Sequence, residues 1–247
     1  MLTVALKDLR SLFLSPIAWV ILALVEAIVA YFFLIYLDYF VQLQPKLVSL
    51  PNAPGVSNIV IAPLFSTIAI VMLLVVPLLT MRSVSEERRG KTLSLLVSAP
   101  ISMSEIIIGK FIGILVFLGF MLLLITLMPL SLLLGGSIDF GLLMSNILAL
   151  VLLLCSFTAL GLYISTLTAQ PAVAAFGTFA ALLLLWIINL TGDSTQDTVL
   201  GYLSLLNHYQ PLLQGIFSST DVIYNLLFTG LFLILGIRRL DAERLAG

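Results

Sequence analysis

Charged residues are scarce in this chain of 247 residues, which contains 11 Lys and Arg and 12 Asp and Glu. They make up 9% of the sequence, whereas hydrophobic residues make up 61%. A soluble domain of this length needs far more polar surface, so the composition excludes one. The cations also form no basic stripe with interleaved aromatic residues, and we therefore expect no nucleic-acid partner.

Cysteine and histidine are equally scarce, with one residue of each. Cys155 lies in an apolar run, so the sequence excludes an internal disulfide. His208 has no second metal-ligating residue nearby, and we expect it to form hydrogen bonds rather than to bind a metal. No Ser/His pair, Asp pair or His-rich cluster is present, which disfavours an intramembrane enzyme. We expect no metal or cofactor in the chain itself.

Long apolar runs are abundant and can cross the roughly 30 Å hydrocarbon core of a bilayer, although the last run is short and could begin earlier, near Leu212. Six spans are predicted: Ile17 to Leu37, Ile59 to Thr80, Ile106 to Leu134, Leu142 to Leu167, Ala172 to Leu190 and Asp221 to Ile237. The first run is too long for the core of a signal peptide, so we interpret it as a retained span. The predicted fold is an all-α polytopic membrane protein with one domain over residues 1–247.

Lysine and arginine are concentrated on one side of the predicted membrane topology. Ten of the eleven precede span one, lie around the loop between spans two and three, or follow span six: Lys7, Arg10, Arg82, Arg88, Arg89, Lys91, Lys110, Arg238, Arg239 and Arg244. The other side holds only Lys46, together with several aspartates that include Asp139. Because Lys and Arg resist translocation, we expect both termini to be cytoplasmic.

Residues 1–15 have the pattern of an amphipathic helix at the membrane interface. Apolar residues recur at three- and four-residue spacing, and they are Leu2, Leu6, Leu9 and Phe13. The alternative is a continuation of span one, but Pro16 favours a break.

The loop over residues 191–219 should lie outside the cytoplasm. It contains two apolar segments, Val199 to Leu206 and Pro211 to Phe217, each too short to span the membrane. We expect both to form short helices that dip into the outer leaflet and pack on the bundle.

Residues 83–104, between spans two and three, hold a concentrated group of charges. Glu86 to Arg89 predicts a helical turn, Gly90 permits a bend, and Thr92 to Val97 predicts a short helix with Leu93, Leu96 and Val97 on one face. Ser102 and Glu105 then fit a capping box at the start of span three. One alternative is a solvated loop that only blocks translocation. Leucines at helical spacing instead favour a helix that docks in a groove of another protein.

The same segment resembles the signature of ABC-2 type permeases. The match runs from Arg82 through Glu86, Glu87, Gly90, Thr92, Leu95, Leu96 and Pro100 to Gly109 and Lys110. Tyr202 to Tyr209, with Gly215, Asp221 to Tyr224 and Phe232, is similar to the gliding-motility-associated branch of that family.

This resemblance implies a permease subunit that is paired with a second permease, as a homodimer or heterodimer, above two cytoplasmic ABC ATPase subunits. It implies transport by export, a location in the cell (inner) membrane with contact to its lipids, and room for an accessory extracytoplasmic subunit. The sequence contains no Gly-x-x-x-x-Gly-Lys-Ser/Thr motif, so ATP and Mg²⁺ are expected on the partner ATPase.

In the family, the loop between spans two and three carries the coupling helix. The residues expected to couple to the ATPase are Glu86, Glu87, Arg88, Arg89, Gly90, Thr92, Leu93, Leu96 and Val97.

Two features lie inside the spans. Glu26 is the only acidic residue well inside one, and it should face the bundle, a water-filled path or a dimer partner because burial in lipid is costly. A substrate or gating role and a protonated structural role remain open, and a secondary transporter or channel that uses Glu26 as a proton or cation site is the alternative function. Gly109 and Gly113 form a small-xxx-small pattern that permits close helix approach.

Overall fold

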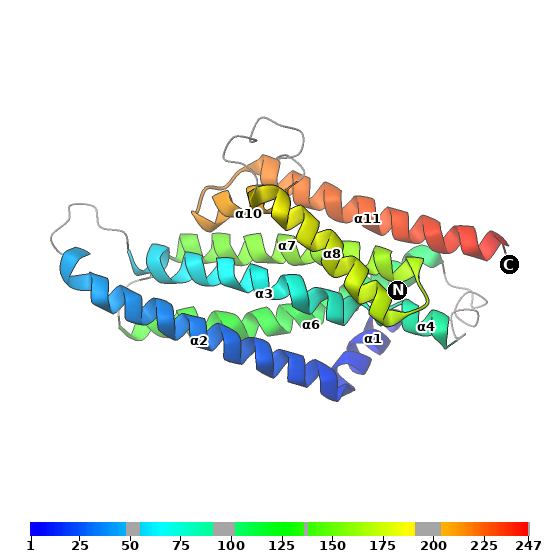
Figure 1. The fold of residues 1–247 in the computed structure, drawn as a ribbon, viewed down its shortest axis with the longest axis horizontal. Coiled ribbons are helices and arrows are strands. Elements are labelled where there is room, and N and C mark those ends of the chain that lie inside the picture. Colours follow the sequence, from blue (N-terminus) through cyan, green and yellow to red (C-terminus); the bar gives the residue numbers. More distant parts are fainter. Residues whose placement is uncertain (48–54, 91–101, 136–137, 191–203, 247) are drawn as a thin grey trace.

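The computed structural model describes residues 1–47, 55–90, 102–135, 138–190 and 204–246 (Figure 1). The described residues contain helices and connections but no strand. The helices are α1 (Leu2–Leu14), α2 (Pro16–Leu47), the π-helix η1 (Ser57–Ile61), α3 (Ala62–Thr80), α4 (Ser85–Arg89), α6 (Met103–Ser131), the 3₁₀ turn η2 (Leu132–Leu134), α7 (Phe140–Leu167), α8 (Pro171–Leu190), α10 (Leu205–Leu213) and α11 (Ser219–Ala246). The predicted all-α fold is confirmed.

Six of these segments are long and apolar enough to cross a membrane, as the sequence predicts. Most follow the long axis of the molecule, and α8 crosses them obliquely (Figure 1). Two helices extend beyond the predicted spans, since α2 continues past Leu37 to Leu47 and α11 continues past Ile237 to Ala246. α1, α4 and the C-terminal part of α11 lie at the same end of the bundle (Figure 1).

Local sequence explains where several helices begin. Ser15 has an extended backbone (φ −78°, ψ 120°), as expected for a residue before proline, so the predicted break between α1 and α2 at Pro16 is present. The predicted capping box is confirmed as well: the Ser102 hydroxyl accepts the Glu105 N–H at 3.3 Å, and Glu105 accepts the Ser102 N–H at 3.2 Å. Asp139 caps α7 by accepting the N–H of Leu142 at 3.1 Å.

The short helix before the last span differs from the prediction. α10 begins within the first predicted segment and ends within the second, so Pro211 to Phe217 is not a separate helix. The helix ends because Gly215 adopts φ 78°, and the N–H groups of Gly215 and Ile216 return to the carbonyls of Leu212 and Pro211 at 3.1 and 2.9 Å. Residues 199–203 of the first predicted segment lie outside the described residues.

α7 occupies the centre of the bundle and packs against α3, α6, α8, α10 and α11. It lies close to α3 at Gly161, where an added Cβ would lie 2.4 Å from the Thr80 hydroxyl oxygen. Gly109 and Gly113 allow a similar close approach between α6 and α1, since added Cβ atoms would lie 3.0 and 3.1 Å from the carbonyl oxygens of Met1 and Ala5. The predicted close approach at this glycine pair is confirmed.

Candidate functional site

α4 is a single helical turn that follows α3 at the end of the bundle that also carries α1 (Figure 1). Its two acidic residues stand in the first turn and its two arginines in the last, which suits the helix dipole. The predicted turn over Glu86 to Arg89 is therefore present. Polar contacts join it to four other helices, and we call this set of contacts the α4 junction; its members are Val84, Ser85, Glu87 and Arg88 with Ser165, Lys110, Asp8, Lys7 and Glu243.

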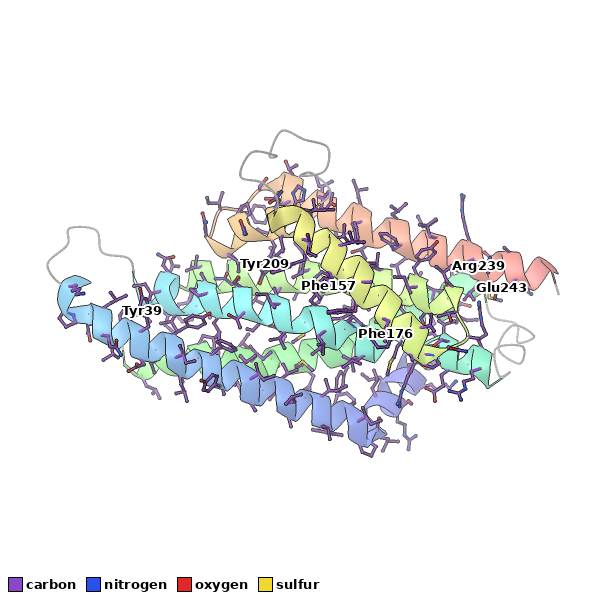
Figure 2. All side chains as sticks on the ribbon, in the orientation of Figure 1. Tyr39, Phe157, Phe176, Tyr209, Arg239 and Glu243 are labelled. Carbon is purple, nitrogen blue, oxygen red and sulfur yellow. The ribbon has the colours of Figure 1, made fainter. Side chains whose placement is uncertain are left out.

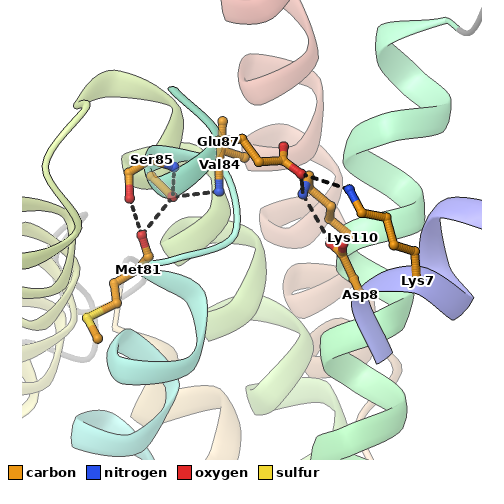
Figure 3. Close-up of polar contacts among 8 residues, drawn as sticks. Lys7, Asp8, Met81, Val84, Ser85, Glu87 and Lys110 are labelled. Atoms are coloured by element: carbon orange, nitrogen blue, oxygen red, sulfur yellow. Dashed lines mark hydrogen bonds and ion pairs between the residues drawn. The ribbon is translucent and has the colours of Figure 1, made fainter. Parts of the chain in front are cut away.

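The start of α4 is held by α7. Val84 and Ser85 are both fully buried, and their N–H groups donate to the Ser165 hydroxyl at 3.2 and 3.1 Å. The first N–H groups of a helix have no partner inside the helix, so Ser165 supplies that partner from a distant segment. The Ser165 and Ser85 hydroxyls also donate to the Met81 carbonyl, which ties the end of α3 to the same point (Figure 3).

The second contact is an ion cluster around Lys110 of α6. The Lys110 side chain is 2% exposed, and its ammonium lies 2.9 Å from a Glu87 carboxylate oxygen and 3.1 Å from Asp8 of α1. Lys7 approaches Glu87 more loosely, at 3.6 Å. Figure 3 shows the Lys110 ammonium between the carboxylates of Glu87 and Asp8. A buried ammonium is tolerated only when it is paired, so these contacts join α1, α4 and α6.

The third contact joins α4 to α11. One Arg88 nitrogen donates to both carboxylate oxygens of Glu243, at 2.7 and 2.6 Å. Arg239 lies one turn before Glu243 and adds a contact of 3.4 Å from the outside (Figure 2). Charged hydrogen bonds of this length are stronger than neutral ones, so α11 is fixed to α4 by a short ionic contact.

The predicted coupling residues are therefore divided by the structure. Glu87 and Arg88 bind within the chain, whereas Glu86, Arg89 and Gly90 are exposed. Thr92, Leu93, Leu96 and Val97 lie outside the described residues.

Glu26 lies away from this site, half-buried on α2. Its Oε1 atom is buried and has no hydrogen-bond partner among the residues that the structure describes.

Sequence reasoning missed the partners of α4. Lys110 counted only as a cytoplasmic cation, although a lysine two turns inside an apolar helix is a signal for a buried ion pair. Ser165 and Glu243 carry no such signal, because they lie 80 and 155 residues from the groups they contact.

A second polar cluster joins α10 to α11. The His208 ring lies 2.7 Å from Asp221 and stacks on Tyr224 with ring centres 4.0 Å apart, which confirms a hydrogen-bonding role for His208. The neighbouring Tyr209 donates to the Phe65 carbonyl at 2.8 Å. Burial raises the pKa of the Tyr209 hydroxyl, so it remains a neutral donor. These contacts fix α10 on the bundle, and in the described part of the chain no three His, Cys, Asp or Glu residues gather as a metal site.

The fold and the site define a class before they define a family: a multi-pass, all-α membrane protein in which a charged turn at one end is bonded to several spans. The chain belongs to the ABC-2 transporter family, because the family model described as ABC-2 family transporter protein matches residues 2–245. A search of curated proteins gave no significant match. Family membership makes the chain a permease subunit of an ABC transporter.

Proposed function

We propose that this permease converts nucleotide-driven movement of a partner ATPase into rearrangement of its spans, and that α4 with the segment after it receives that movement. The observation that supports this proposal is the α4 junction. Because α4 is bonded to α1, α6, α7 and α11, a displacement of α4 acts on four helices at once.

Each side of α4 has a separate task in this proposal. Glu87 and Arg88 transmit the movement inward, because their partners belong to the permease itself. Glu86 and Arg89 are exposed and face the ATPase, where they orient it. Leu93, Leu96 and Val97 supply the apolar contact, since apolar burial gives affinity whereas exposed ion pairs contribute little.

The assembly that follows contains two permeases, identical or different, and two cytoplasmic ATPases that bind ATP and Mg²⁺. The proposed direction is export across the cell (inner) membrane, with both termini in the cytoplasm. We retain an accessory extracytoplasmic subunit and the gliding-motility-associated branch as predictions.

One observation favours a second candidate function. Glu26 places a buried carboxylate oxygen on a membrane span, and that oxygen has no hydrogen-bond partner in the described part of the chain. A secondary transporter or channel would use this group to bind a proton or cation, and it would need no ATPase.

The experiment that tests the proposal replaces Leu96 with Asp. The change should leave membrane insertion unchanged, because residue 96 is predicted to lie outside the spans, but it should reduce ATPase co-purification and substrate-stimulated hydrolysis by about tenfold. The control is Arg244→Glu, a charge change at an exposed position near the end of α11. Normal insertion with full ATPase association and full stimulation contradicts the coupling assignment. Absence of any ATPase from the native complex favours the Glu26 function.

A further inference from the structure

A cleft of about 450 Å³ lies at the α4 junction; it shares Glu86 with the exposed side of α4 but does not include Arg89. Its walls come from α1, the start of α2, the end of α3, α4 and α6. We propose that this cleft binds a phospholipid of the cytoplasmic leaflet, with the phosphate at Arg82 and Ser83 and an acyl chain along the apolar floor.

The residues of the cleft change from polar to apolar along each helix. Arg82 and Ser83 lie in the turn that follows α3, at the end of the bundle, and Leu78 and Leu79 lie deeper, on the last turn of α3. On α6, Lys110 is followed one turn deeper by Ile114. The start of α2 contributes Ile17, Ala18 and Ile21 to the same floor. This order matches a molecule with a polar head at the membrane surface and a hydrocarbon tail below it.

The elbow between α1 and α2 has the features of a membrane interface. Trp19 is 47% exposed and donates its ring N–H to the Phe13 carbonyl at 2.7 Å. Tryptophan is enriched at this depth because its ring is apolar while its N–H is polar. Leu6 and Leu14 of α1 are also exposed, at 62% and 72%, so the outer surface of the elbow offers apolar groups to lipid.

Two groups at the polar end of the cleft have unused hydrogen-bonding capacity. The Ser83 hydroxyl oxygen is buried and has no hydrogen-bond partner in the described chain. Arg82 is exposed and has no ion-pair partner within the same residues. A guanidinium next to a hydroxyl is a suitable donor pair for a phosphate group.

The charges of the lining select the head group. Lys7, Arg82 and Lys110 are balanced by Asp8, Glu86 and Glu87, and Lys110 and Lys7 together neutralise the carboxylates of Asp8 and Glu87. Arg82 and Glu86 therefore remain as a cation and an anion, the first in the turn after α3 and the second on α4. A zwitterionic lipid with a primary ammonium, such as phosphatidylethanolamine, satisfies both, since its phosphate meets Arg82 and its ammonium donates to Glu86.

The test titrates phosphatidylethanolamine, phosphatidylcholine and phosphatidylglycerol onto the purified permease in detergent and counts bound lipid by native mass spectrometry. Phosphatidylethanolamine should bind best. Arg82→Gln should weaken its binding by about tenfold, with a smaller loss for Ser83→Ala. Glu86→Gln should remove the preference over phosphatidylcholine, whose ammonium cannot donate.

The matched control is Arg10→Gln, which removes an exposed cation of α1 that does not line the cleft. It should change binding by less than about twofold. Equal losses in Arg82→Gln and Arg10→Gln overturn the proposal in favour of general surface attraction. Displacement of the lipid by millimolar inorganic phosphate, or tighter binding of phosphatidylglycerol, overturns it as well. The ATPase is absent from this measurement, so its result is independent of the coupling proposal.

Discussion

Lys110 is the central residue of the α4 junction, because its buried ammonium forms ion pairs with carboxylates from two other helices. Lys110→Met should lower the free energy of unfolding by about 3 kcal/mol, since it leaves Asp8 and Glu87 largely buried without their cation. Denaturant titration of the purified permease in detergent measures this loss.

The control for this variant is Lys7→Met, which removes a side chain that is 63% exposed from the same Glu87 carboxylate. Its effect should stay below about 1 kcal/mol. Adding Asp8→Asn and Glu87→Gln to Lys110→Met should restore much of the stability, because the amides that replace the two carboxylates carry no charge and need no cation. A Lys110→Met protein as stable as the Lys7→Met protein would show that the ion cluster contributes little.

Gly161 permits a close contact between α7 and α3. Gly161→Ala should destabilise the permease by about 1–3 kcal/mol, because the new methyl group would lie 2.9 Å from the Cβ of the fully buried Thr80. Gly119→Ala is the matched control, since Gly119 lies on α6 with nothing within 4 Å of an added Cβ. Thermal unfolding of both variants tests the prediction, and equal melting temperatures would contradict it.

Some contacts of individual residues could be predicted from the sequence, and others could not. The glycine pair Gly109 and Gly113 was predictable, because its spacing places both on one helix face. The partners of Glu87 and Arg88 were not, since an ion pair between α4 and α11 depends on the fold and leaves no local pattern. A charge on a predicted loop is equally consistent with an external partner and with an internal one.

Whole helices were predicted more accurately than their ends. Each of the six spans appears near its predicted place, because a membrane span requires a continuous apolar run. α2 and α11 exceed their predicted limits because hydropathy records where apolar character ends, whereas a helix ends where its hydrogen bonds end. The end of α10 is a second example, because the backbone conformation of Gly215, rather than a change in hydropathy, ends this helix.

The division of α4 into an inner and an outer side gives a test with two adjacent arginines. Arg88→Gln removes the contact to Glu243, so it should leave ATPase association unchanged but reduce substrate-stimulated hydrolysis by about tenfold. Arg89→Gln alters an exposed side chain, so it should weaken ATPase association by about two- to fivefold and leave the stability of the permease unchanged.

Pull-down of the ATPase, hydrolysis rates and thermal stability, measured on both variants, provide the comparison. The proposal requires the two arginines to differ in kind, one affecting transmission and the other affecting docking. If both variants lose association to the same extent, Arg88 also faces the partner and the α4–α11 contact is not part of the coupling path.

The charges of the molecule are distributed unevenly, because nine cations of its described residues belong to α1, α4, α6, α11 and the turn after α3, at or near one end of the bundle (Figure 1). Lys46 lies near the opposite end of α2. This arrangement brings together in space the cations that the sequence places in separate loops. By the positive-inside rule, we predict that this end of the bundle faces the cytoplasm, with α4 toward the proposed ATPase.

Cysteine labelling in intact cells tests that orientation, on a Cys155→Ser background so that the chain has no other thiol. Cysteines at positions 10 and 90 should react with a membrane-impermeant maleimide only after the cells are opened, because both positions are exposed at the cation-rich end. Cysteines at positions 55 and 139 should react in intact cells, since they flank the spans at the other end. Every variant must first react in detergent, which shows that its thiol is accessible to the reagent. Labelling of position 90 in intact cells would place α4 on the wrong side of the membrane for a cytoplasmic ATPase, and it would contradict both the orientation and the coupling that depends on it.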